Sequence, residues 1–160
     1  MEKNSIEDFP TNKNYRSIIF TFNEQKYEIN VSLYSNAILV FISFNGKISN
    51  LYELNIDNSE EQDMNDYNYI DESEENYIKD IEIAQCILGK RGNEQMDFIA
   101  NFIMTYIKDI ILKINSKINK ICLSLSLDIN LVNNIEEHEK VKKFLNIIKE
   151  NIGKIFIIGK

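Results

Sequence analysis

The hydrophobic and polar positions in the first third of the chain alternate with the period of two that is typical of β-strands. Over residues 27–34, apolar side chains at every second position predict a strand with one buried and one polar face. Over residues 37–44, both alternating sets are apolar, which indicates a central strand covered on both sides. The same reasoning predicts further strands at residues 17–22, 48–56, 81–88 and 119–127.

Two segments instead follow the 3.6-residue period of an amphipathic helix. The first covers residues 94–116; Asn93 suits its N-cap, and its apolar stripe is wider than one contact with a sheet requires. The second covers residues 135–152, and Gly153 is expected to end it. Residues 154–158 then form a short apolar tail, a candidate last strand.

Short polar turns connect the first four strands. Residues 23–25 and 35–36 supply two of them, and Asn45-Gly46 provides the positive φ angles of a two-residue hairpin. Strands joined in this way predict an antiparallel meander, whereas residues 128–134, before the second helix, are expected to form a loop. The whole order, β-β-β-β-β-α-β-α, is typical of an α+β fold in which two helices pack on an antiparallel sheet of about six strands.

The chain has 160 residues, of which 44% are hydrophobic, so it fits a single domain, residues 1–160, with a substantial core. Its charge is unevenly distributed: residues 57–80 hold ten acidic residues against one lysine, whereas the rest sums to +2 within a total of −7. This stretch has too little apolar surface to offset its ordering entropy, so we expect a disordered acidic insertion. The alternative is a tyrosine-containing loop that becomes ordered on a partner.

The residue types that perform catalysis are sparse and scattered. Cys86 and Cys122 lie far apart in predicted strands, without the spacing of a metal or redox site, and a buried free thiol is the usual role there. His138 stands among glutamates on a predicted polar helix face, where a surface role is favoured over general-base or thiol-pair chemistry. Residues 89–92 precede a helix as a phosphate loop does, yet lack the GxxxxGKS/T pattern. We therefore expect no enzyme, no cofactor and no metal site.

The densest basic group is Lys140, Lys142 and Lys143, and three glutamates lie beside it. Nucleic-acid binding requires clustered cations with stacking aromatic residues, so we interpret this group as a solvated helix face and expect no nucleic-acid partner. The longest apolar run, residues 37–42, is far shorter than the ~20 residues of a membrane helix, and no membrane partner is expected. Because residues 1–5 lack the apolar stretch of a signal peptide, we expect a soluble cytoplasmic protein, with the nucleus as the second compartment.

A set of short motifs follows one order along the chain. Its members are Ser35 in a turn, Ile-Leu-Val at residues 38–40, Phe-Asn-Gly-Lys at residues 44–47, Ile-Leu-Gly at residues 87–89, and Phe-Ile-Ala-Asn-Phe at residues 98–102 in a helix. The set resembles the proteasome assembly chaperone 3 family over residues 17–150. It departs from that family at Asn45, in the acidic insertion and in the C-terminal tail. Proteasome assembly chaperone 4 has a related order, so the choice between the two families stays open.

The resemblance implies a non-enzymatic chaperone. Chaperones 3 and 4 form a dimer that binds proteasome α-subunits and guides assembly of the 20S α-ring. The expected partners are therefore a chaperone-4-like subunit and α-subunits, with a homodimer in isolation as an alternative. No binding residue carries over from the family, because the matching motifs are core and turn positions.

The strand over residues 37–44 also indicates a partner. If the helices cover one face of the sheet, Ala37, Leu39 and Phe41 remain as an exposed apolar patch on the other, and such patches mark interfaces. These three residues are the expected interface. Two alternatives stay open: the sheet curls and buries both faces within the monomer, or the chain is a longin- or roadblock-like adaptor of trafficking or GTPase signalling complexes, which also combines an antiparallel sheet with helices.

Overall fold

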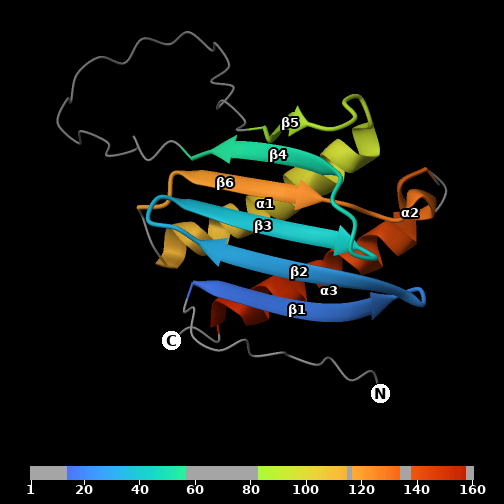
Figure 1. The fold of residues 1–160 in the computed structure, drawn as a ribbon, viewed down its shortest axis with the longest axis horizontal. Coiled ribbons are helices and arrows are strands. Elements are labelled where there is room, and N and C mark those ends of the chain that lie inside the picture. The colour runs from blue at the N-terminus through green and yellow to red at the C-terminus, as the bar shows by residue number, and fades with distance from the viewer. Residues whose placement is uncertain (1–13, 57–82, 115–116, 134–137, 158–160) are drawn as a thin grey trace, which may run out of the picture.

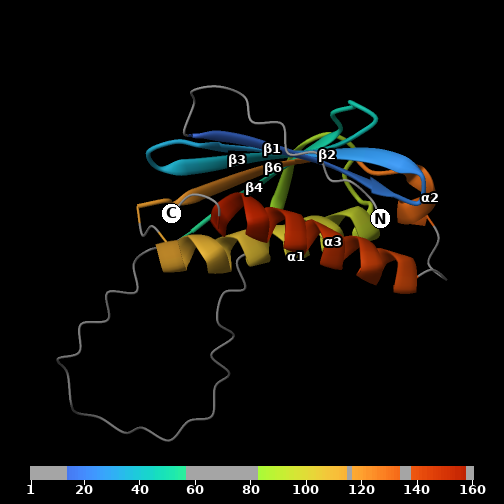
Figure 2. The ribbon, with the colours of Figure 1, turned by 90° about the horizontal axis from the view of Figure 1, so that it is seen from below.

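The computed structural model describes residues 14–56, 83–114, 117–133 and 138–157. The described part has two layers, a sheet and a pair of long helices packed on one of its faces (Figure 2). The acidic insertion expected at residues 57–80 lies outside the described residues.

Six strands form one sheet with the spatial order β1-β2-β3-β6-β4-β5 (Figure 1). Their bounds are β1 Tyr15–Phe22, β2 Gln25–Leu33, β3 Ala37–Phe44, β4 Asn50–Asn55, β5 Gln85–Leu88 and β6 Lys120–Leu125. Every neighbouring pair is antiparallel except β3 and β6, which run in parallel. The predicted α+β class with a largely antiparallel sheet is confirmed, and the β3–β6 pair makes the sheet mixed.

The described helices are α1 Glu94–Ile114, α2 Ile129–Asn133 and α3 His138–Ile157. The two long ones, α1 and α3, are those that the sequence predicts, and they lie side by side on one face of the sheet (Figure 2). Asn93 caps α1 as predicted, because its side-chain oxygen accepts the backbone N–H of Met96 at 3.0 Å. The short α2 replaces part of the predicted loop, since the Asp128 carboxylate caps it by accepting the backbone N–H of Asn130 at 3.1 Å.

The predicted four-strand meander is wrong after its third strand, because β6 lies between β3 and β4. The two-residue turn itself is present: Asn45 and Gly46 have φ angles of 49° and 71°. The backbone N–H of Lys47 donates to the carbonyl of Phe44 at 3.0 Å, but beyond this isolated bridge the two strands separate. β6 fills the gap and pairs with both strands, which places its apolar side chains at the buried centre of the sheet.

The prediction that Gly153 ends the second helix is wrong, because α3 continues to Ile157. Residues 154–157 are therefore helical and do not form a last strand. Glycine within a helix costs up to ~1 kcal/mol relative to alanine, so intrinsic propensity does not explain this turn. Packing of the neighbouring residues explains it, because Ile152 and Ile155 of α3 are buried in the core on either side of this position. The glycine itself suits a close contact, since a Cβ at position 153 would lie only 3.3 Å from the hydroxyl oxygen of Tyr106 on α1.

The core lies between the sheet and the two long helices. On the strands, the inward set that includes Ile29, Val40 and Leu123 is fully buried. An aromatic cluster joins α3 to the first hairpin, with the Phe144 ring centroid 5.1 Å from that of Tyr27. Apolar burial of this kind stabilises the fold by about 25 cal/mol per Å² of surface removed from water. The inward half of each strand therefore serves the folding of the monomer.

Candidate interaction surface

The sheet face opposite the helices carries no helix of the described part of the chain (Figure 2). β3 divides its side chains between the two faces. Val40 is 0% exposed beneath the helices, whereas the alternating set Ala37, Leu39 and Phe41 is half-buried on the open face. The predicted interface residues therefore lie together on the uncovered side of the central strand.

The strand order extends this apolar set beyond β3. Leu39 and Phe41 lie beside Cys122 and Ser124 of β6 in the parallel register. Leu51 of β4 lies on the other side of Ser124, which is too short to separate the larger side chains. We call this apolar surface the sheet patch; it consists of Ala37, Leu39, Phe41, Leu51 and Cys122.

The β1–β2 half of the open face is mostly polar, with Ile19 as its apolar exception, and several of its side chains bond to one another. The Tyr15 hydroxyl donates to Asn30 Oδ1 at 2.7 Å, and the Ser17 hydroxyl donates to Glu28 Oε1 at 3.2 Å. The outward charged residues of the six strands are two lysines and two glutamates, Lys26, Glu28, Glu53 and Lys120. The open face is therefore nearly neutral; the sheet patch is its central apolar area, and Ile19 of β1 and Leu88 of β5, the register partner of Leu51, are further apolar side chains outside the patch.

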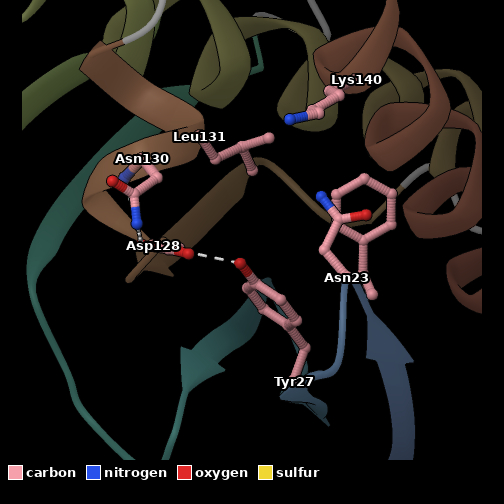
Figure 3. A pocket seen from close by; sticks show the side chains of 7 residues that line it. Asn23, Tyr27, Asp128, Asn130, Leu131 and Lys140 are labelled. Atoms are coloured by element: carbon pink, nitrogen blue, oxygen red, sulfur yellow. Dashed lines mark hydrogen bonds between the residues drawn. The ribbon is translucent and has the colours of Figure 1, made fainter.

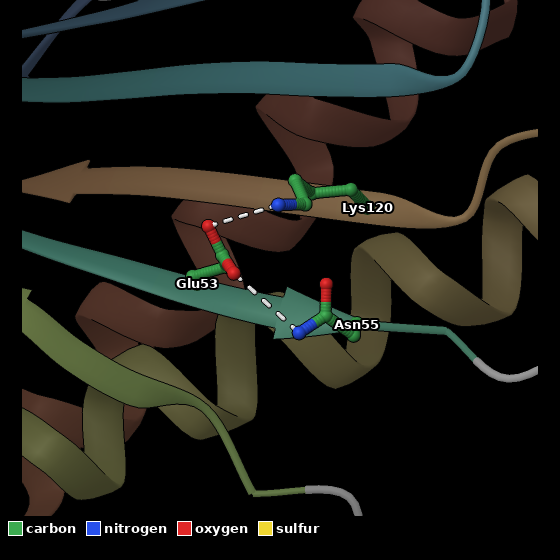
Figure 4. Close-up of polar contacts among 3 residues, drawn as sticks. All are labelled: Glu53, Asn55 and Lys120. Atoms are coloured by element: carbon green, nitrogen blue, oxygen red, sulfur yellow. Dashed lines mark hydrogen bonds and ion pairs between the residues drawn. The ribbon is translucent and has the colours of Figure 1, made fainter.

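An ion pair borders the sheet patch (Figure 4). The Lys120 Nζ of β6 lies 3.2 Å from Glu53 Oε2 of β4, and the Asn55 side chain donates to Glu53 Oε1 at 3.4 Å. Cys122 is the register partner of Glu53. Burial is the main cause that raises the pKa of the Cys122 thiol, and the charge of Glu53 adds to it while Lys120 opposes it. The thiol is protonated at neutral pH and contributes to the patch as a small apolar group.

The loop before α1 is anchored to β4 by Asn50, a buried polar residue. Asn50 Oδ1 accepts the backbone N–H of Lys90 at 3.1 Å, and Asn50 Nδ2 donates to the Lys90 carbonyl at 3.0 Å. Gly89 has a φ of +112°, and a Cβ there would lie 2.9 Å from the Cα of Asn50. Only glycine fits this close approach, so packing against β4 explains this glycine of the Ile-Leu-Gly motif without a phosphate ligand.

Tyr52 connects the sheet to α1 at the same place. Its hydroxyl donates to Asp97 Oδ1 at 2.8 Å and accepts from Asn50 Nδ2 at 3.3 Å. Burial is the main cause that raises the pKa of Tyr52, and its contact with Asp97 acts in the same direction although the Asn50 bond opposes it. The hydroxyl is therefore a neutral structural donor at physiological pH.

A small cavity of about 50 Å³ lies where the first hairpin meets α2 and α3 (Figure 3). The backbone N–H of Asp128 donates to the Tyr27 hydroxyl at 3.4 Å, while the Asp128 carboxylate caps α2. Burial, the largest cause, raises the pKa of Tyr27 to about 12; the Asp128 backbone bond lowers it and the Asp128 charge raises it. The volume suits a few waters, and the polar groups around it hold the framework together.

A second cavity, of about 430 Å³, opens at the end of the sheet near the last turns of α1 and α3. Its walls are mostly apolar, with Ile38 and Ile118 from the sheet side and Ile111 and Phe156 from the helices. None of its lining residues is a carboxylate, histidine, cysteine or lysine. Tyr34 and Ser35 bring hydroxyl groups to this lining, but no histidine, carboxylate or lysine lines the cavity with them to act as an activating base.

The residues that could perform chemistry do not converge. Cys86 is the register partner of Tyr52, and Cys122 is the partner of Glu53, so the thiols lie on opposite faces of the sheet. Both thiols are free, as the sequence predicts, and each is partly rather than wholly buried. His138 is exposed at the first turn of α3. Among the described residues, no three His, Cys, Asp or Glu side chains gather as a metal site.

None of the helices in the described ranges is both long enough and apolar enough to cross a lipid bilayer. The helices bury their apolar stripes against the sheet instead, and both long ones carry charged residues on their outer sides. This is the pattern expected of an amphipathic helix that packs on one face.

Sequence reasoning missed part of this surface. Leu51 and Cys122 become neighbours of Phe41 and Leu39 only because β6 enters between β3 and β4, and no local pattern carries that information. A signal for Asn50 was present, because it is a polar residue at an inward position of an alternating strand. A polar residue there requires buried hydrogen-bond partners, which the loop before α1 supplies.

Comparison with known proteins identifies the fold. No protein-family model matches the sequence, and no curated protein matches it. A chain of the crystal structure of a novel chaperone complex for yeast 20S proteasome assembly matches this structure with a TM-score of 0.56. The chain shares its fold with a chain of that yeast complex. The match covers 88% of this chain and 96% of the yeast chaperone chain at 16% sequence identity, so the likeness is one of fold.

Proposed function

We propose that this protein is a non-enzymatic chaperone of proteasome assembly that works as a dimer. Its sheet patch contacts a chaperone-4-like subunit, or a second copy of the chain in isolation. The dimer binds proteasome α-subunits in the cytoplasm and promotes assembly of the 20S α-ring. The observation that supports this most directly is an uncovered apolar patch on a fold shared with a chain of a proteasome assembly chaperone complex.

The chemistry of the open face suits another sheet. Stable interfaces bury ~800 Å² on each partner, and two sheets stack face to face about 10 Å apart. The open face is nearly neutral and has Leu39 and Phe41 at its centre, so association is driven by apolar burial more than by charge. The ion pair of Glu53 and Lys120 then lies at the rim, where it favours a defined orientation of the partner.

The dimer can be tested with Leu39→Asp and Phe41→Asp. In the dimer interface, the introduced carboxylate would lose its water without gaining a partner, whereas in the monomer it stays in contact with water. We therefore expect both variants to remain folded and to become monomeric. Thr21→Asp is the matched control, because Thr21 is exposed on the polar half of the same face. Sedimentation velocity measures the association, and circular dichroism measures the fold.

Two results would count against the proposal. If the Asp variants unfold while Thr21→Asp does not, the patch belongs to the core of the monomer and is not a seam. If the wild-type chain stays monomeric at high concentration and binds neither a chaperone-4-like subunit nor any purified α-subunit, the assembly function is wrong.

The thiols provide a second reporter, because Cys122 lies in the sheet patch and Cys86 lies on the other side of the sheet. Alkylation of Cys122 by N-ethylmaleimide should slow when the protein concentration is raised through the dimerisation range. Alkylation of Cys86 should not change. Mass spectrometry of the modified peptides gives both rates in one sample, and equal slowing of both would argue against a seam at the patch.

The adaptor alternative predicts different partners from a tagged chain. Trafficking or GTPase complexes should yield GTPase or coat subunits, whereas a proteasome assembly chaperone should yield α-subunits. Quantitative mass spectrometry against a Phe41→Asp bait separates the two, because partners bound through the dimer are lost from the mutant bait.

A further inference from the structure

The outer side of the helix layer carries a shallow groove of about 590 Å³ between α1 and α3. We call it the helix groove; its lining residues are Tyr106, Asn146, Lys149, Glu150, Gly153 and Lys154. Gly153 contributes only backbone, and the Tyr106 hydroxyl lies where a Cβ at 153 would be crowded, at 3.3 Å. The helix-interior glycine thus keeps open a groove that alanine would partly fill.

The ammonium group of Lys149 is held at a defined place in this groove. The Lys149 Nζ lies 4.9 Å from the ring centroid of Tyr106 and 5.5 Å from that of Phe102. Cation–π contacts at these distances orient the ammonium over the ring faces. Lys149 is only half-buried, so the ammonium remains within reach of an incoming carboxylate.

An aromatic row continues from the groove along α1. Phe98 is 59% exposed and lies one turn before Phe102, on the same side of the helix. A large apolar side chain left this exposed beside two half-buried aromatic rings forms an anchor surface for an apolar side chain from outside. The helix groove therefore offers both a fixed cation and an apolar row.

The charge of this side differs from that of the open sheet face. α3 carries five lysines and two glutamates, and Lys142 and Lys143 are exposed about two turns before Lys149. Glu150, which also lines the groove, stands four residues before Lys154, a spacing at which opposite charges offset each other. The outer side of α3 is therefore basic overall, whereas the open sheet face has equal numbers of each sign.

We propose that the helix groove docks an acidic segment of the client protein, with carboxylates at Lys149 and Lys154 and an apolar side chain on the Phe98–Phe102–Tyr106 row. The inference rests on the proposed function, because a dimer seam on the sheet leaves the helix layer as the large free face for the client. Charge complementarity selects the occupant: a basic surface speeds encounter with an acidic partner and disfavours a basic one.

The groove can first be tested with a defined probe, a synthetic peptide of alternating glutamate and phenylalanine residues. The peptide is titrated into the ¹⁵N-labelled full chain, and NMR detects which backbone amides shift. We expect shifts at the Gly153 and Lys149 amides and none from a matched lysine–phenylalanine peptide. Gly153→Ala should weaken binding of the peptide several-fold, because its methyl group occupies the groove; circular dichroism checks that this variant, whose Cβ lies 3.3 Å from the Tyr106 hydroxyl oxygen, is folded. Absent shifts at Gly153, or equal binding of a single-stranded DNA oligonucleotide, would overturn the assignment to an acidic protein segment.

Binding of the client protein at the groove is tested with purified α-subunits and the intact dimer. Lys149→Glu combined with Lys154→Glu should weaken α-subunit binding by about tenfold or more, with the dimer unchanged by sedimentation. Lys47→Glu combined with Lys90→Glu is the control, since this pair makes the same total charge change at exposed positions outside the groove. Unchanged α-subunit affinity in the groove double variant overturns the inference. A wild type that binds the acidic peptide at the groove but no α-subunit overturns the proposed client while supporting the acidic docking site.

Discussion

The two faces of the sheet are built by the same strands, yet their side chains are packed to different degrees. On the helix side, Val40 and its inward neighbours pack against α1 and α3 and are almost completely excluded from water. On the open side, Leu39 and Phe41 stay half-buried among short polar side chains such as Ser43 and Ser124. The difference shows that the core of the described fold lies on the helix side, and partly exposed apolar residues on the other face are typical of an interaction surface.

The sharpest test of this contrast substitutes one phenylalanine on each side. Phe144 is 0% exposed within the aromatic cluster, so Phe144→Ala should lower the free energy of unfolding by roughly 3–5 kcal/mol. Phe41→Ala removes a half-buried ring and should lower the stability of the monomer by about 1 kcal/mol. Urea denaturation at low protein concentration measures both. Losses of similar size would show that the open face is as closely packed as the helix side.

Alkaline titration probes the helix side through Tyr27. Burial raises the pKa of Tyr27 to about 12 in the folded state, whereas an unfolded tyrosine titrates near ~10. The folded state therefore holds its proton more tightly, so the contribution of Tyr27 to stability is complete below pH ~10 and is lost as pH rises through about 12. Tyr27→Phe should make the decline of the unfolding free energy above pH ~10 shallower. A decline as steep as that of the wild type would mean that Tyr27 is not its source.

The stability contributed by a single hydrogen bond can be compared between the two faces by removing one tyrosine hydroxyl on each. The Tyr52 hydroxyl bonds to Asp97 across the helix–sheet interface, so Tyr52→Phe should lower stability by about 1–1.5 kcal/mol. The Tyr15 hydroxyl bonds to Asn30 on the exposed part of the open face, and Tyr15→Phe should change stability by less than about 0.5 kcal/mol. Thermal unfolding of both variants in one buffer is the measurement. The reverse order would contradict the contrast between the faces.

The smallest expected effect is that of the ion pair at the rim of the sheet patch. Glu53 and Lys120 are 3.2 Å apart but partly exposed, so Glu53→Gln and Lys120→Gln should each change monomer stability by less than ~1 kcal/mol. A double-mutant cycle on the monomer gives the coupling, which should decrease with added salt. A coupling well above this range would show that the pair is already desolvated in the monomer.

Much of the fold follows from local pattern. Period-two and period-3.6 segments identify the six strands and the two long helices, because each period dictates which side chains share a face. Asn93 as the cap of α1 and Asn45-Gly46 as a tight turn also follow from residue type, since the hydrogen bond or the positive φ angle belongs to that short segment. The same alternation places Ala37, Leu39 and Phe41 on one face of the strand, but both faces of this strand are apolar, so only the packing of the helices decides that this face is the open one.

Contacts between distant segments were decided only by the tertiary structure. The insertion of β6 between β3 and β4 brings Cys122 and Leu51 to the sheet patch, and it depends on which strand edges can pair after the chain has crossed the helix layer. The helix continues past Gly153 because Ile152 and Ile155 on either side of it are buried in the core. Local sequence fixes the periodicity of each element because its backbone hydrogen bonds and side-chain directions are local. Strand order and the helix groove are set by packing between elements, whose energy depends on the whole assembled fold.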